Sequence, residues 1–321
     1  LNWFQDPDPS IRLQGAAGAV ALFVLVLLAI ALWRSAEFVV GRVTRSWRAN
    51  GVRRFADAMV RWISGIAMAA VLFVVVGTLL SLAIWSMTSV WRFPDSLPSQ
   101  FSFAAWKALW PALGEHLAVT MILATASATA AVVIVLGCLE NESWNSTAPS
   151  NFSLTLLYVP LVVPQISFLF GLQIVFVALD VDGTWGAVIL SHLIFVLPYV
   201  YLVLSDPYRA LDLRYARAAS SLGAPPFRVF LRVRAPLILG AMAASFAVGF
   251  AVSVTQYLAT LFPGAGRFST LTTEAVIAAS GGDRRIAAVY SLSQLLLPLL
   301  VFAAATVLSS RRANNISDIQ K

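Results

Sequence analysis

Seven segments of the chain are apolar over lengths that could cross a lipid bilayer, and none of them contains lysine or arginine. They run over residues 15–33, 62–85, 116–138, 152–178, 185–205, 237–260 and 287–308. A membrane-spanning helix needs about 20 mainly apolar residues. Hydrophobic residues make up 59% of the chain and charged residues only 12%, and this apolar excess is spread over too many segments for one buried core. The sequence therefore predicts an all-α integral membrane protein with about seven transmembrane helices.

The 22 lysines and arginines are unevenly distributed between these segments. If successive segments cross in alternate directions, 16 of them lie on one side and six on the other, whereas the acids divide seven to eight. A bias in basic residues alone is the positive-inside pattern, which predicts an outer N-terminus and a cytoplasmic C-terminus for this sequence. Loop 139–151 is the exception, because it is placed inside without a basic residue. The net charge of +7 is then a topology signal and does not indicate nucleic-acid binding.

Prolines and polar residues interrupt three of the apolar segments. A proline removes a backbone donor, and a glutamine in hydrocarbon is costly without a partner, so such residues should face protein or a wet cavity. The candidates are Pro160, Pro164, Gln165, Ser167, Gln173, His192, Thr255 and Gln256. Two interpretations stay open. These residues form packing kinks and ordinary hydrogen bonds between helices, or they line a bent, movable translocation pathway.

The segment 206–236 is basic and lies on the predicted cytoplasmic side. Apolar residues at helical spacing between Leu211 and Leu222 predict a short amphipathic helix, and Gly223 offers its stop. A second short helix should follow Pro226, and Pro236 should start the sixth membrane helix. One interpretation is an interfacial helix pair whose arginines contact anionic lipid headgroups.

The spacing within this segment supports a second interpretation. "AASSLG", nine further residues and then "VRAP" resemble the cytoplasmic EAA motif of binding-protein-dependent ABC importer permeases, in which Glu-Ala-Ala, three residues, Gly and nine residues precede Ile-x-Leu-Pro. The residues on motif positions are Ala218, Ala219, Gly223, Val233 and Pro236. Arg217 replaces the motif glutamate and Ala235 the motif leucine, which leaves open any pairing that the glutamate would make. The resemblance covers about residues 60–310 and is to the methionine-importer type of permease.

The resemblance implies a type I importer permease domain of six helices in a bacterial inner membrane. Its coupling helix would dock on a dimer of separate ATPase subunits, and an external periplasmic binding protein would deliver the small solute for alternating access. The implied docking residues are Arg217, Ala218, Ala219, Leu222, Gly223, Ala224, Val233 and Pro236. Only Lys107 and Lys321 are lysines and neither follows glycine, so the chain contains no P-loop. ATP with Mg²⁺ is therefore expected on the partner, and no cofactor on this chain.

A faint similarity between residues 8–34 and 283–312 suggests a repeat. It predicts that 1–34 is the last transmembrane helix of a preceding permease repeat and 62–310 a permease domain. Residues 35–61 would be a basic cytoplasmic linker and 311–321 a cytoplasmic tail. This arrangement is similar to the tandem permeases of some thiamine and ferric-iron importers, which carry both halves on one chain. A second permease half is therefore an expected partner, with the lipid bilayer.

Other classes of membrane protein fit less well. A secondary transporter would use ionisable groups within the membrane, but Asp, Glu, Lys and Arg are all missing from the seven segments, with Glu115 at one edge. An enzyme would need paired catalytic groups, whereas Asp180 and Asp182 fit a turn and His192 fits a satisfied buried histidine. Two histidines and one cysteine do not make a Cys/His metal site. A channel would leave the motif spacing unexplained.

Overall fold

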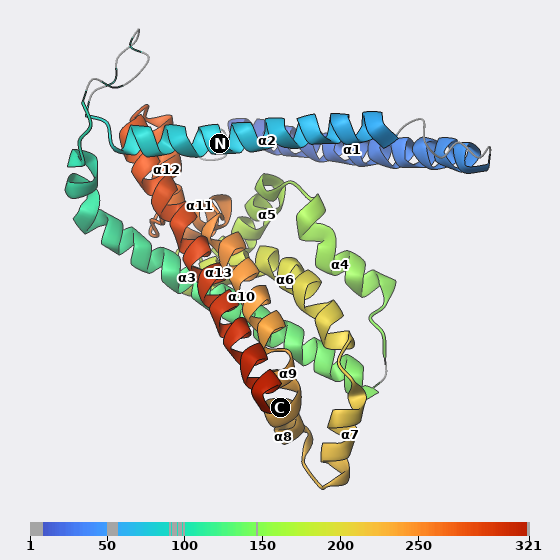
Figure 1. Ribbon diagram of the computed structural model, residues 1–321. Helices are drawn as coiled ribbons and strands as arrows, with labels where there is room; N and C mark the ends of the chain where they lie inside the picture. Colours follow the sequence, from blue (N-terminus) through green and yellow to red (C-terminus); the bar gives the residue numbers. More distant parts are fainter. Residues whose placement is uncertain are drawn as a thin grey trace.

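The computed structural model describes residues 9–49, 57–89, 91, 95, 98, 100–145 and 147–319, and these residues form helices and no strand. The two long helices α1 and α2 precede a bundle in which α10 packs on α3, α6 and α13, and α12 packs on α13 and α3 (Figure 1). The helices are α1 Pro9–Ala49, α2 Asp57–Ser86, α3 Ala104–Asn145, α4 Asn151–Val162, α5 Gln165–Ala178, α6 Trp185–Arg209, α7 Leu213–Ser221, α8 Pro226–Val229, the π-helix η2 Phe230–Arg234, α9 Ala235–Leu237, α10 Leu239–Val254, α11 Leu258–Gly264, α12 Leu271–Ser280 and α13 Arg284–Ile319.

Five of the described helices are long and apolar enough to cross a membrane, and counting each of two bent pairs as one span raises the number to seven. The predicted segments 15–33 and 287–308 lie inside longer helices, because α1 continues to Ala49 and α13 to Ile319. Helix therefore occupies residues 35–49 and 57–61 of the predicted linker and 311–319 of the predicted tail. Residues 50–56 of the linker lie outside the described part of the chain.

The segment 152–178 was predicted to be one interrupted span and forms two helices, α4 and α5, that meet at 105°. The break has a local cause. Proline disfavours the helical conformation of the residue before it, and Val163 is extended at φ −74° and ψ 132° ahead of Pro164. Pro164 itself caps the start of α5. Pro160, by contrast, is accommodated inside α4, so only the second proline separates the helices.

The best-packed part of the bundle lies where α3, α6 and α10 meet. Buried residues of one apolar cluster include Val135 from α3 and Val196 and Val200 from α6. Gly249 of α10 lets the helices approach closely, because a Cβ atom there would lie 2.8 Å from Val200 Cγ2 and 3.0 Å from Val196 Cγ1. Small residues at such crossings are typical of membrane helices, whose association depends on close packing. The same apolar cluster reaches Leu139 near the end of α3 and Tyr208 near the end of α6, beside the site described next.

Helices α1 and α2 contrast with this unit. The apolar windows that qualify them as membrane spans have no buried residue. α1 contacts the bundle at α5, and α2 contacts it at α13 (Figure 1). Apolar side chains exposed along whole helices are expected where the surroundings are lipid or another apolar protein surface.

Candidate coupling segment and membrane pathway

The segment between α6 and α10, residues 213–237, is called the coupling segment from here on. Its first helix, α7, begins at Leu213, and the preceding Asp212 caps it with a carboxylate that accepts a hydrogen bond from the Arg214 backbone N–H at 2.9 Å. The helix ends as the sequence predicted. Gly223 adopts φ +82°, and the N–H groups of Gly223 and Ala224 donate to the carbonyls of Ser220 and Ala219. This is the hydrogen-bond pattern of a Schellman cap, in which glycine takes the left-handed position.

The structure exposes the outer face of α7 and its cap. Leu222 is 89% exposed, and Arg217, Ala218 and Gly223 are also exposed. Ala219 and Ala224 are half-buried. The side chain of Ala216 points the other way and is buried. An apolar residue as large as leucine at the tip of a turn is available for contact with another surface. The predicted docking role of these residues is untested by this geometry and stays a prediction.

The second half of the coupling segment differs from the single short helix that was predicted. It consists of α8, the five-residue π-helix η2 and the short α9. Val233 lies in η2 and Pro236 in α9, both half-buried. Pro236 does not start the sixth membrane helix, which begins at Leu239 after a bend of 79°. π-helical turns carry an extra residue per turn and therefore rotate the side chains that follow them. Here the π-helix ends at Arg234, which points into the protein.

Arg234 is the centre of a polar cluster in which Arg234 and Tyr208 are buried, Glu140 is half-buried and Trp144 is exposed at the edge. Its Nη1 lies 2.9 Å from Glu140 Oε2, and its side chain is only 8% exposed. Arg234 Nη1 also donates to the Tyr208 hydroxyl at 3.0 Å, and that hydroxyl donates to Glu140 Oε1. The guanidinium lies over the Trp144 ring, 5.5 Å from its centroid. A buried charge needs an opposite charge and hydrogen bonds, and this cluster supplies both.

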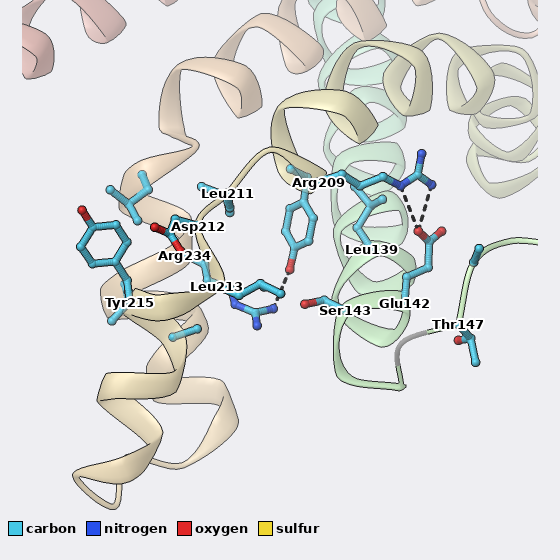
Figure 2. Close-up of a pocket in the computed structure, with 15 residues that line it drawn as sticks. Leu139, Glu142, Ser143, Thr147, Arg209, Leu211, Asp212, Leu213, Tyr215 and Arg234 are labelled. Atoms are coloured by element: carbon cyan, nitrogen blue, oxygen red, sulfur yellow. Dashed lines mark hydrogen bonds and ion pairs between the residues drawn. The ribbon is translucent and has the colours of Figure 1, made fainter.

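A second ion pair lies nearby at the end of α3. Arg209 Nη2 is 2.9 Å from Glu142 Oε2 and 2.7 Å from the Tyr201 hydroxyl. Figure 2 shows Arg209 and Glu142 facing each other beside the pocket between the ends of α3 and α6 and the start of α7. The Arg209 side chain is 43% exposed, so this pair is more accessible to water than the first.

The acids of these two ion pairs account for loop 139–151, which departs from the charge trend because it has no basic residue on the predicted inner side. Glu140 and Glu142 lie at the end of α3, in the stretch that carried no basic residue on the predicted inside. Sequence reasoning treated this stretch only as a departure from the charge trend and missed both pairs. The available signal was charge complementarity, because two acids faced the arginine-rich segment across the same predicted side of the membrane.

The structure brings only some of the pathway candidates together. Gln165 of α5 donates from Nε2 to Gln256 Oε1 at 3.3 Å across the break after α10, and Gln256 is buried while Gln165 is exposed. Thr255 is exposed and bonds to the Val252 carbonyl of its own helix. Pro160, Pro164, Ser167 and Gln173 are half-buried along α4 and α5. A lining role for these residues stays a prediction.

His192 is held inside the protein between three helices. It is 1% exposed, with Nδ1 2.7 Å from Ser253 Oγ of α10 and Nε2 3.0 Å from Thr260 Oγ1 of α11. Both ring nitrogens therefore have partners, as the interpretation of a satisfied buried histidine requires. Within the described part of the chain there is also no group of three His, Cys, Asp or Glu side chains that could hold a metal ion.

Comparisons with known proteins identify the class. Residues 134–314 match the sequence model of the family described as "Binding-protein-dependent transport system inner membrane component". The matched region holds α4 to α12, the whole coupling segment and most of α13. The chain belongs to this family of ABC importer permeases, so the predicted class is confirmed. It is a multi-pass inner-membrane permease component, and the predicted all-α integral membrane fold is confirmed with it.

Individual relatives agree with the family. The Escherichia coli K12 "Inner membrane ABC transporter permease protein YnjC" is 40% identical over 153 residues, which are 48% of this chain and 30% of that protein. The "Putrescine transport system permease protein PotI" of the same strain is 26% identical over 236 residues, covering 68% of this chain and 83% of that protein. A chain of the bacterial alginate ABC transporter, solved with its pentasaccharide-bound periplasmic protein, has the same fold with a TM-score of 0.54 at 12% identity, over 81% of this chain and 98% of that one.

Proposed function

We propose that the chain moves a small solute across the inner membrane by alternating access, powered by ATP hydrolysis on a separate dimer of ATPase subunits. An external binding protein delivers the solute, and a second permease half completes the pathway. The N-terminus of this sequence lies outside and the C-terminus in the cytoplasm. The family supports the general class, and the positive-inside distribution of arginines supports this orientation.

The observation that carries the proposal is the exposed end of α7. A rigid Schellman cap presents Leu222 and the small residues Ala218 and Gly223 outward, on the segment where the family motif is found. Small residues let a partner approach the backbone closely, and an exposed leucine offers an apolar anchor for a pocket on that partner. Arg217 stands where the motif has an acid, so the matching surface of this ATPase should lack the basic partner that the acid would attract.

Substitution of Gly223 tests the docking role. A Cβ at Gly223 would meet nothing within 4 Å in this chain, so the G223D side chain has room and projects into the expected interface, at the cost of backbone strain from φ +82°. We expect G223D to reduce the amount of P-loop ATPase that co-purifies with the tagged chain from its native membrane by about tenfold, which corresponds to a hot-spot loss of about 1.4 kcal/mol. Quantitative mass spectrometry of the purified complex measures this ratio.

Gly282 provides a matched control. It has φ +81°, against +82° for Gly223, and a Cβ there also meets nothing within 4 Å. Gly282 lies in the turn before α13, at the end of the bundle away from α7 (Figure 1). G282D therefore introduces the same backbone strain and the same charge without touching the expected interface. Equal loss of the ATPase in both variants, or full retention in G223D, would reject the docking role.

A further inference from the structure

Two pockets lie between parts of the coupling segment and α3, although Phe230 of η2 packs against the apolar cluster that includes Leu136 of α3. The first, of about 330 Å³, lies between the end of α3 and α7 and is lined by Leu139 and Ser143 of α3 and by Leu213 and Tyr215 of α7 (Figure 2). The second, of about 400 Å³, separates Val133 and Gly137 of α3 from Pro226 and Phe227 of α8. Pockets on both flanks mean that much of the coupling segment lacks the continuous side-chain packing on α3 that would transmit a push.

α7 packs on η2 and α8, and residues 210–212 join it to α6, so a movement of α7 reaches the membrane helices both through η2 and along the chain into α6. The last residue of η2 is Arg234, which crosses between the pockets to reach α3. There it meets Glu140 at 2.9 Å and lies over Trp144, while Tyr208 bonds to both charged groups. Arg234 is thus a charged bridge from the coupling segment to the end of α3.

We propose that the Arg234–Glu140 ion pair transmits movement of the coupling segment to α3, so that Arg234 is a positioning residue for transport. This inference rests on the proposed docking of α7 to an ATPase. A buried pair suits this task better than apolar packing, because separating its charges leaves both uncompensated in a poorly solvated site. The pair therefore resists being pulled apart, and the two elements move together when α7 is displaced.

The neighbouring Arg209–Glu142 pair supplies an internal control. It also joins an arginine to an acid of α3 at 2.9 Å, but Arg209 belongs to α6 and not to the coupling segment. The two pairs thus share their chemistry and differ in the element that they tie to α3. R209Q removes the charge at the end of α6 and its ion pair with α3, while the contact of Arg234 with α3 stays intact.

The experiment uses the complete transporter reconstituted in lipid nanodiscs, with spin labels on cysteines placed at Gly114 of α3 and Ser280 of α12 and with Cys138 changed to alanine. Both label positions are exposed. The non-hydrolysable ATP analogue AMP-PNP is the probe, and pulsed electron paramagnetic resonance measures the distance distribution. In otherwise native protein, AMP-PNP should shift the population toward a second distance.

R234Q and E140Q should each reduce the AMP-PNP-induced population about tenfold while the ATPase stays bound, a change within the range by which coupling residues act. R209Q should leave the shift intact. The exchange R234E with E140R restores an ion pair and should recover at least part of the shift. A purely structural pair would instead lower assembly in R234Q and E140Q, and the exchange variant would recover assembly and shift together.

Several results would overturn the proposal. They are an unchanged shift in R234Q, equal loss in R209Q, absence of any AMP-PNP shift in the native background, or loss of assembly in R234Q and E140Q that accounts for the missing shift. Failure of the proposed docking is recognised separately, because G223D would then retain the ATPase. If G223D releases the ATPase but R234Q shows the normal AMP-PNP-induced shift, the proposed function still holds and only the role of the Arg234–Glu140 pair is rejected.

Discussion

Replacing His192 with leucine separates a structural role from a role in the translocation pathway. Leucine is apolar and of comparable length, so H192L should fill the site while removing both ring nitrogens. The hydrogen bonds lost are those to Ser253 Oγ at 2.7 Å and Thr260 Oγ1 at 3.0 Å, which tie α6 to α10 and α11. Because His192 is buried, neither lost bond is readily replaced by water.

The magnitude follows from the two bonds. Side-chain hydrogen bonds between membrane helices contribute about 0.6 kcal/mol on average and up to about 1.7. Thr260 keeps the Gln256 carbonyl at 2.9 Å as an acceptor, so its hydroxyl is not left without a partner. We therefore expect the free energy of unfolding to fall by about 1–3 kcal/mol, with most of the loss arising at Ser253.

Reversible unfolding in mixed micelles, followed by circular dichroism at increasing denaturant, measures this change. Thr255 offers the control, because it is exposed and its hydroxyl bonds within its own helix to Val252. T255V should alter the free energy of unfolding by about 0.5 kcal/mol or less. Native stability of H192L together with a changed apparent affinity for the transported solute would refute the structural role and place His192 on the pathway.

Two further substitutions test the packing and the caps. G249V should lower the free energy of unfolding by about 1–3 kcal/mol in the same assay, because the valine side chain overpacks the crossing with α6. Adding V200A should make room and recover part of this loss. If the double variant is as unstable as G249V alone, the steric explanation is wrong. T270A should lower the free energy of unfolding by about 1 kcal/mol and speed amide hydrogen exchange in the first turn of α12, because Thr270 Oγ1 accepts a hydrogen bond from the Thr273 N–H at 3.2 Å. Unchanged exchange in that turn would show that the cap contributes little.

The membrane class and the short helix α7 could be predicted from the sequence because their signals are local. A long apolar run without lysine or arginine is by itself enough to indicate a helix that spans the membrane. The end of α7 was predictable for the same reason, since glycine is the residue that adopts φ +82° without strain. The break at Pro164 was visible as a proline, but its 105° angle depends on how α4 and α5 pack on the rest of the bundle.

The π-helix could not be predicted in this way. Its residues, Phe230 to Arg234, have an ordinary amphipathic pattern, which indicated a continuous short helix. The extra residue in the turn rotates the Arg234 side chain toward α3. Its contact with Glu140 there stabilises this orientation, and no local sequence pattern reveals that contact. Sequence reasoning therefore grouped Arg234 with the exposed arginines of the loop, whereas Arg232 is exposed and Arg234 is buried.

The sequence by itself determined that the chain crosses a membrane repeatedly, which loops are basic and where α7 ends. Only the tertiary structure decided which charges meet. Arg234 and Glu140 are 94 residues apart, and His192 is 61 residues from Ser253. Residues so far apart meet only when whole helices pack against one another, so the energy that selects their contacts belongs to the assembled bundle and not to any one segment.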